Sequence, residues 1–225
     1  MMGGDGTVLR AARDLVKRHL PLFGVNLGTL GYLAEVDQDH LETALDHLVL
    51  GEYITEEHMM LRGVVCHEGQ EILSDVALND IVIARSGRIH VMDLKIYVND
   101  RFLNEYSADG MIISTPTGST GYSMAAGGPI VEPTAKNLLL TPICPHSTRS
   151  SSYVLSPDHV ITVEAADANR KFVYLSVDGG KAFSLKNGDQ VRVSTSKYTT
   201  KLVRLSKKSF CEILDKKMGT EASKK

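Results

Sequence analysis

The chain lacks the features that mark secreted, membrane or nucleic-acid-binding proteins. Its three cysteines, Cys66, Cys144 and Cys211, lie far apart and form no CxxC pair, so neither a zinc knuckle nor a disulfide framework is indicated. No apolar run approaches the roughly 20 residues of a membrane helix, and no signal peptide is visible. The net charge is −2 over 225 residues, which gives no reason to expect nucleic acid or an anionic membrane as a partner. We therefore expect a protein of the reducing cytoplasm.

Two structural patterns follow one another along the chain. Residues 7–19 and 37–50 have the apolar spacing of helices, on either side of a short buried strand in "PLFGVNLG", and Gly51 marks the end of the second helix. After about residue 55, β-branched runs separated by polar turns take over, with Asn99-Asp100 as a hairpin turn.

These patterns predict an α/β plus all-β fold. We expect a partial N-terminal α/β domain over residues 1–57 and a larger antiparallel β-rich domain over 58–206. One helical interruption falls near residues 119–127. A C-terminal helix and tail occupy 207–225, with the helix over Lys207 to Met218.

The first candidate site is the glycine-rich loop "GGDGT" near the N-terminus. Gly3, Gly4 and Gly6 allow the backbone to approach a ligand closely, and Thr7 is placed to cap the helix that follows. Free N–H groups at a helix N-terminus favour phosphate. An acid beside a phosphate site repels the substrate unless it has a further role. Asp5 has such a role if it holds a divalent cation or accepts a proton from an attacking hydroxyl. An equally weighted alternative makes Asp5 a helix-capping turn residue, and the loop lacks the lysine of a Walker motif.

Two further segments contain residues suited to a nucleotide. In "GTLGYL" (28–33), Tyr32 offers an aromatic face, although such a segment is more often an ordinary turn. Asn79 and Asp80 lie inside an apolar strand, where unpaired polar side chains cost several kcal/mol. Either they lie at a bulge, or a ligand pairs with them, since asparagine can read an adenine edge and aspartate can accept two ribose hydroxyls.

The segment "ADGMIISTPTGSTGYSMAAGGPI" is the most informative. An apolar strand at 111–114 is followed by four hydroxyl side chains, two glycines and a proline in residues 115–121. Such hydroxyls and free N–H groups suit an adenine, a ribose or a phosphate, although a loop of this composition is usually only a turn.

Taken together, the motifs resemble those of the NAD kinases. "GGDGT" (3–7), "GTLGYL" (28–33), "LNDIVI" (78–83), "DGMIISTPTGSTGYSMAAGGPI" (109–130) and "LTPICPHS" (140–147) occur in this order, and "SVDGG" (176–180) also fits. The resemblance covers residues 3 to about 215. It implies transfer of the γ-phosphoryl group of ATP, or of polyphosphate, to the 2′-hydroxyl of the adenosine ribose of NAD, which yields NADP. It also implies Mg²⁺ or a similar divalent ion with the donor.

The resemblance also implies roles for individual residues. Asp5 is the expected catalytic base for the 2′-hydroxyl, and Asp109 and His159 are expected near the nicotinamide half. No protein residue is expected to form a dedicated metal site. The expected substrate-binding residues are Gly3, Gly4, Gly6, Thr7, Tyr32, Asn79, Asp80, Asp109, Thr117, Thr120, Gly121, Tyr122 and His159.

The chain departs from the family pattern in two places. Gly121 stands where alanine is common. A strand, a helix and a strand normally precede "GGDGT", so "MM" resembles the end of a missing strand, and we expect a fragment with weak or no activity. The alternatives are a lipid kinase of the diacylglycerol or sphingosine type, and a non-catalytic dinucleotide-binding fragment. A homo-oligomer, dimer or tetramer, is expected from the resemblance.

Overall fold

The described chain divides into two compact units. The computed structural model describes residues 1–28, 31–86, 91–146, 150–166, 168, 172–205 and 209–215. The first unit contains residues 1–58 and the chain from Thr199 on, and the second contains Met59–Tyr198. The predicted division after residue 57 lies one residue from the first boundary. The predicted division after residue 206 does not coincide with a unit boundary, because strand β14 (Asp189–Arg204) runs unbroken from the second unit into the first.

The first unit has α/β structure. Met2 and the strands β1 (Val25–Asn26) and β2 (Val36–Asp37) lie side by side in parallel. Helix α1 buries Val8 and Ala12, which belong to the apolar stripe seen in the sequence. The helices and turns of this unit are α1 (Asp5–Asp14), η1 (Val16–Arg18), η2 (Gln38–His40) and α2 (Leu41–Leu50).

The ends of these two helices refine the sequence prediction. Helix α1 begins at Asp5 rather than Thr7, with Gly4 at its N-cap and no side-chain cap; the prediction that Thr7 caps it is therefore wrong. Helix α2 ends as predicted at Gly51, whose φ of 73° lies in the left-handed region that favours glycine.

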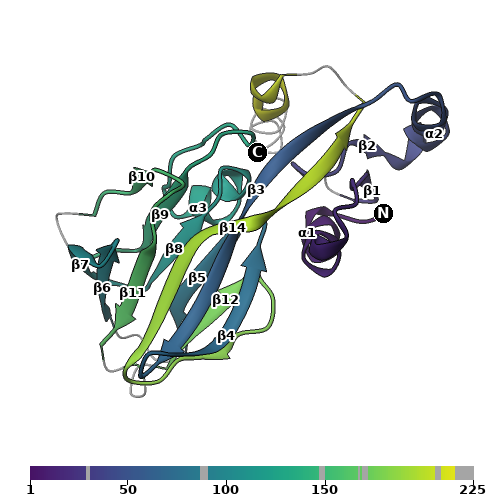
Figure 1. Cartoon of the computed structure of the whole chain (residues 1–225). Coiled ribbons are helices and arrows are strands. Elements are labelled where there is room, and N and C mark those ends of the chain that lie inside the picture. The colour runs from purple at the N-terminus through teal and green to yellow at the C-terminus, as the bar shows by residue number, and fades with distance from the viewer. Residues whose placement is uncertain are drawn as a thin grey trace. The chain divides into compact units, whose positions relative to one another are not determined.

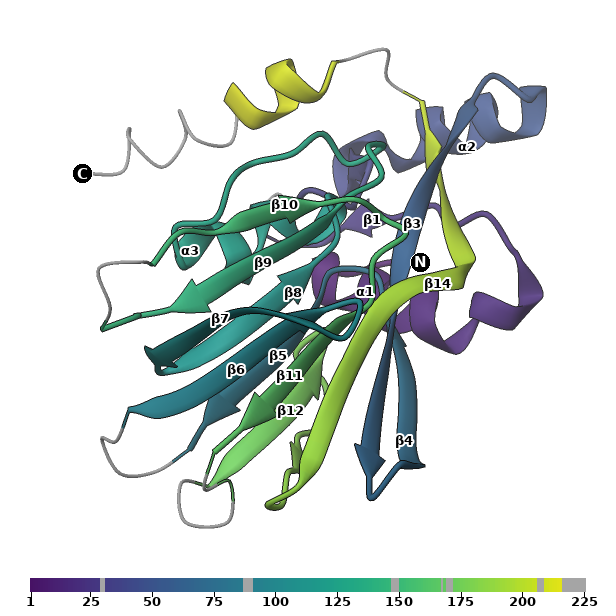
Figure 2. The ribbon, with the colours of Figure 1, turned by 60° about the vertical axis from the view of Figure 1, so that its left-hand side comes forward.

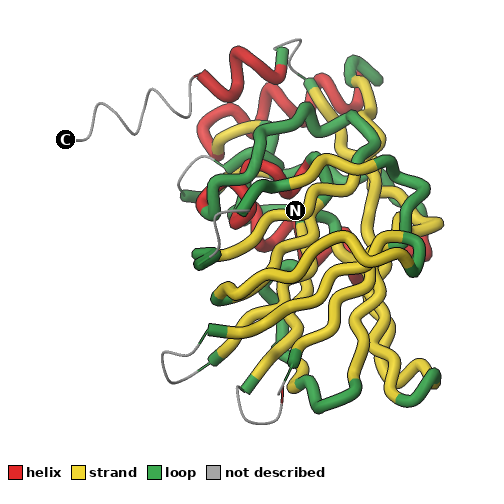
Figure 3. Tube along the Cα trace, turned by 90° about the vertical axis from the view of Figure 1, so that its left-hand side faces the viewer, coloured by secondary structure: helices red, strands yellow, loops and turns green. Residues whose placement is uncertain are grey.

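The second unit consists mainly of two antiparallel six-stranded sheets, drawn in Figures 1 and 2. One has the order β10-β9-β8-β5-β12-β13 and the other the order β4-β3-β14-β11-β6-β7. In Figure 3, where strands are yellow, this unit is seen to consist mostly of β-strands. The strands are β3 (Ile54–His67), β4 (Gln70–Ala77), β5 (Asp80–Arg85), β6 (Met92–Val98), β7 (Arg101–Ala108), β8 (Gly110–Ser114), β9 (Leu138–Ile143), β10 (Tyr153–Leu155), β11 (Ile161–Ala165), β12 (Val173–Val177), β13 (Phe183–Ser184) and β14.

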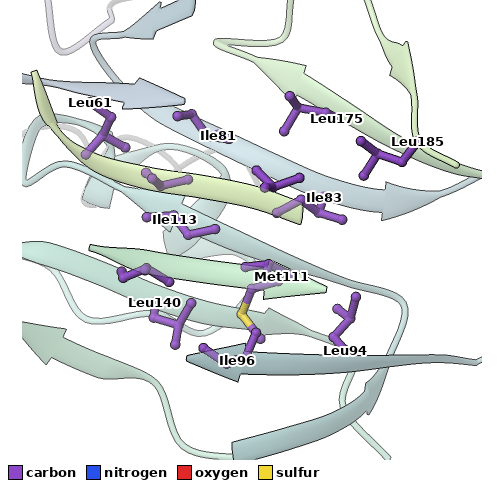
Figure 4. Close-up of a cluster of buried hydrophobic side chains, with 14 of the residues drawn as sticks. Leu61, Ile81, Ile83, Leu94, Ile96, Met111, Ile113, Leu140, Leu175 and Leu185 are labelled. Atoms are coloured by element: carbon purple, nitrogen blue, oxygen red, sulfur yellow. The ribbon is translucent and has the colours of Figure 1, made fainter. Parts of the chain in front are cut away.

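The core of the second unit lies between the two sheets. Figure 4 shows side chains of β5, β8 and β9, among them Ile83, Met111 and Leu140, close to those of β6, which include Leu94 and Ile96. All five are fully buried. Alternate residues along each strand thus point apolar side chains into the core, and this core supports the loops at the strand ends.

One predicted hairpin turn and the predicted helical interruption are confirmed. Asn99 and Asp100, with φ of 49° and 62°, form a turn between β6 and β7 of the type that joins hairpins. The predicted helical interruption near 119–127 is two short helices, η3 (Thr117–Thr120) and α3 (Tyr122–Ala125), which are separated at Gly121. The predicted fold class, an α/β part followed by an antiparallel β part, is confirmed.

The C-terminal helix begins slightly later than predicted. Residues 210–215 are helical. The N–H and hydroxyl of Ser209 donate to the Glu212 carboxylate at 2.6 and 2.9 Å, and the Glu212 N–H donates to Ser209 Oγ at 3.3 Å. This capping box starts the helix after Ser209. The predicted stretch beyond 215 lies outside the described residues, and no described helix is both long and apolar enough to cross a membrane.

Candidate functional site

The glycine-rich loop of the first unit leads directly into helix α1. Gly3 has a φ of 148° and its N–H donates to Val25 O at 2.9 Å, so the loop is attached to the end of β1. A Cβ on Gly4 or Gly6 would meet no atom within 4 Å. The first turn of α1 is therefore open on the glycine side and without a side-chain cap, which is the arrangement that attracts an anion.

Asp5 does not cap its own helix. Its carboxylate accepts hydrogen bonds from the N–H groups of Tyr32 at 2.6 Å and Leu33 at 3.0 Å. A Cβ on Gly31 would collide with this carboxylate, so the glycine allows the close approach. The structure thus brings Asp5 together with the "GTLGYL" segment, of which Thr29 and Leu30 lie outside the described residues. In the sequence, the glycine-rich loop and the segment 28–33 are two separate candidate sites.

Asn79 and Asp80 stand at the start of β5 in the second unit. Across the sheet, Asp178 follows β12, and its carboxylate accepts hydrogen bonds from the N–H groups of Leu78, Asn79 and Asp80 at 2.8, 2.8 and 3.0 Å. The backbone of the Asn-Asp pair is therefore fixed by one side chain about a hundred residues away. The sequence points to Asp178 only as a member of the segment 176–180 that fits the family pattern, and it assigns the residue no role in the site.

Burial makes Asp80 unusual. It is 6% exposed, and desolvation, followed by the nearby charge of Asp178, raises the pKa of its carboxyl to about 7. Within the described chain, Asn79 Oδ1 is buried and has no hydrogen-bond partner. A buried acceptor of this kind is costly unless something pairs with it, which fits the ligand-reading alternative for this pair.

The hydroxyl-rich loop after β8 packs against the same turn. Thr115 Oγ1 donates to Leu78 O at 2.6 Å, and the Thr115 N–H donates to Asn79 O at 2.9 Å. A Cβ on Gly118 would collide with the backbone carbonyl of Asn79. Thr115 and Gly118 are contacts that the sequence did not single out; only glycine permits the second one.

Thr117, Thr120, Gly121 and Tyr122 follow in this loop. Both threonines are buried, and Tyr122 is 46% exposed. The pKa of Tyr122 is raised first by desolvation and then by three acidic groups, which include Asp80. The four residues thus lie in the loop attached to Asn79 and Asp80, as expected of one binding region.

The last two predicted residues have partners of their own. Asp109 forms an ion pair with Arg85, whose Nε and Nη2 lie 2.9 and 2.8 Å from Asp109 Oδ1; the sequence did not suggest this partner. His159 Nδ1 lies 2.8 Å from Asn99 Nδ2, at the β6–β7 turn of the other sheet. His159 therefore belongs to a different sheet from Asn79, and its predicted role stays a prediction.

No cluster of three potential metal ligands occurs among the described residues. Each unit taken by itself thus has one feature typical of nucleotide-binding phosphotransferases: the first has an open helix N-terminus beside an oriented carboxylate, and the second has a polar strand end with a hydroxyl-rich loop.

Comparison with known proteins identifies the family. Residues 1–53 match the model of the ATP-NAD kinase N-terminal domain, and residues 78–205 match that of the ATP-NAD kinase C-terminal domain. NAD kinases of Agathobacter rectalis and Acetivibrio thermocellus are 47% and 44% identical over 222 and 213 residues. These alignments cover 97% and 95% of this chain and 77% and 74% of the relatives. The chain belongs to the NAD kinase family.

Two solved structures share the fold. The yeast NADH kinase, in complex with NADH, matches with a TM-score of 0.89 and 28% identity over 97% of this chain; the chain spans 64% of the yeast protein's length. The NAD kinase of Archaeoglobus fulgidus, in complex with ATP, matches with a TM-score of 0.79 and 28% identity over 96% of this chain and 81% of that protein.

Proposed function

We propose that this protein is an NAD kinase that transfers the γ-phosphoryl group of ATP to the 2′-hydroxyl of the adenosine ribose of NAD. The observation that carries the proposal is the Asp5 carboxylate, which two backbone N–H groups orient beside an open, uncapped helix N-terminus. In the reaction, the ribose oxygen attacks the γ-phosphorus, the bond to the β-phosphate oxygen breaks, and ADP leaves. Asp5 takes the hydroxyl proton as general base.

Backbone and side chains of the first unit would bind the donor. The N–H groups at Gly4 and Gly6 and the positive end of helix α1 favour its phosphates, with Gly3 and Thr7 completing the loop and Tyr32 beside the adenosine. Mg²⁺, when bound with ATP, would be held mainly by the phosphates and would neutralise their charge, which leaves the Asp5 carboxylate to act as the base. The ATP-bound Archaeoglobus relative supports ATP as a donor.

Residues of the second unit would bind NAD. The unpartnered Asn79 Oδ1 supports recognition of the adenine amino group, and ionised Asp80 would accept ribose hydroxyls. Thr117, Thr120, Gly121 and Tyr122 would line the same region, and Asp109 and His159 would serve the nicotinamide half. The NADH-bound yeast relative supports binding of this class of dinucleotide.

The decisive experiment is an NADP-forming assay on the purified chain with and without Asp5→Asn. A cycling assay that amplifies NADP detects even slow turnover. We expect turnover to fall about 10²–10⁴-fold, the usual contribution of a general base, while calorimetric NAD affinity changes only a few-fold. Equal turnover by Asp5→Asn would remove Asp5 from the chemistry. Phosphorylation of a lipid diol in place of NAD would refute the proposed acceptor.

Two expectations from the sequence accompany this proposal. The three cysteines are free thiols in the described residues, which supports a reducing, cytoplasmic location. A dimer or tetramer remains the proposed assembly, and light scattering at several concentrations measures it directly.

A further inference from the structure

The two N–H groups that orient Asp5 belong to a short segment between a loop and strand β2. Leu33 and Ala34 are buried, and the Glu35 N–H donates to Gly24 O at 2.9 Å. The segment is therefore held from one side by backbone pairing. It also has a second attachment, through the side chain of Glu35 and the carbonyl of Leu33.

That second attachment is Arg204, the last residue of β14. Its Nη1 lies 3.3 Å from a Glu35 carboxylate oxygen and 3.5 Å from Leu33 O. The other Glu35 oxygen accepts the Leu205 N–H at 2.9 Å. The carbonyl of Leu33 thus faces Arg204 while its N–H faces Asp5, so a single residue lies between the guanidinium and the carboxylate proposed for catalysis.

The Arg204 guanidinium also pairs with two carboxylates, at a site largely shielded from water. The side chains of Arg204 and Glu35 are 9% and 3% exposed. On the other side, Arg204 Nε donates to Glu56 at 2.8 Å. The pKa of Glu56 is lowered to about 2, with the His58 hydrogen bond as the largest cause and Arg204 contributing. The planar guanidinium presents its N–H donors in fixed directions to two carboxylates and a carbonyl, whereas a lysine ammonium is a compact charge without this fork.

We propose that Arg204 is a positioning residue for phosphoryl transfer: by holding Glu35 and Leu33, it sets the backbone N–H groups that orient Asp5. This inference rests on the proposed function. All the residues in it belong to the first unit, which contains Asp5. Displacement of a reacting group by about 1 Å costs up to about a hundredfold in rate, so this support acts on turnover without touching a substrate.

The test is Arg204→Lys, which keeps the charge and loses the fork. We expect kcat for NADP formation to fall about tenfold or more, with the KM for NAD unchanged. In the absence of substrates, native-state hydrogen exchange should be faster at the Tyr32 and Leu33 amides and unchanged in β5 and β8. Arg62→Lys is the matched control, because Arg62 contacts both oxygens of Glu71 at 3.1 and 2.9 Å in an exposed pair; it should alter neither readout.

Each outcome decides the point. Normal kcat in folded Arg204→Lys, or a lower kcat without faster exchange at the two amides, overturns the inference. If Arg204→Lys does not fold, Glu35→Gln replaces it, since glutamine still accepts the Leu205 N–H but loses the charge that pairs with Arg204. Unfolding of both variants also overturns the inference, because Arg204 would then support the whole unit. An unmodified chain that binds NAD but makes no NADP refutes the proposed function in favour of the non-catalytic dinucleotide-binding alternative, whereas the amide exchange still tests the positioning.

Discussion

Asp5 in the first unit and Asp80 in the second lie in contrasting surroundings. Asp5 is half-buried, and its carboxylate is oriented by two backbone N–H groups. Asp80 is almost fully buried beside the Asp178 carboxylate, and its pKa is raised to about 7. In one unit, backbone donors control where a carboxylate points. In the other, desolvation and a like charge control whether a carboxyl is ionised.

The comparison indicates different roles for the two carboxyl groups. An oriented carboxylate suits a proton acceptor that must meet a hydroxyl at a fixed angle. Asp80 is buried, and its backbone is held in place by Asp178, so its carboxyl suits ligand binding. The charge of this carboxyl becomes favourable only when ligand hydroxyls replace the water that burial removed. Changes in the first unit should therefore act on turnover, and changes in the second on NAD affinity.

The largest expected effect confined to the second unit comes from Gly118→Ala. The new Cβ would overlap the backbone of Asn79, which cannot move aside as a flexible side chain can. We expect a loss of about 1–3 kcal/mol in the free energy of unfolding, typical of overpacking, and weaker NAD binding. Thermal unfolding and calorimetry measure both. Unchanged values would show that Asn79 is not held by this loop.

A smaller effect is expected from pH and from Asp178→Asn. The raised pKa of Asp80 means that the folded state holds its proton to higher pH than the unfolded state. Its contribution to stability is therefore present below about pH 4 and is lost as pH rises to about 7. If ionised Asp80 binds ribose, the NAD dissociation constant should rise about tenfold per pH unit below about pH 7.

Asp178→Asn removes the like charge, so the pKa of Asp80 should fall. The pH below which NAD affinity declines should fall with it. The shift should be about one unit or less, because desolvation is the larger cause. Calorimetric titrations from about pH 5 to about pH 9 bracket the transition. If the pH at which NAD affinity declines does not change, Asp178 acts only through its hydrogen bonds.

The smallest effect is expected from Gly121→Ala. A Cβ there would lie 3.3 Å from Gly118 O and 3.5 Å from Asn79 Nδ2, so the nearer of these atoms would have to shift by only a few tenths of an ångström. We expect a change in unfolding free energy within about 0.5 kcal/mol and unaltered NAD affinity. Since it lies three residues from Gly118, this variant is the control for Gly118→Ala, and a large loss here would contradict the packing described for the loop.

Much of the fold was predictable because its signals are local. Gly51 ends α2 and Asn99-Asp100 closes a hairpin through backbone angles that few residue types adopt. The start of α1 was misjudged, because Thr7 is an ordinary capping residue and nothing local shows that Gly4 takes that position. Asp178 was given no role, since no signal in the sequence indicates which amides its carboxylate will meet.

The order of the motifs and the change from helical to strand periodicity were enough to place the chain in its family and to select Asp5, Asn79 and Asp80. Tertiary structure alone decided what holds these residues: the N–H groups of Tyr32 and Leu33 for Asp5, Asp178 for the Asn79–Asp80 turn, and Arg204 for Glu35. The physical reason is distance along the chain. Turns and helix ends depend on a few neighbouring residues, whereas a buried charge finds its partner only after strands far apart in the sequence have paired.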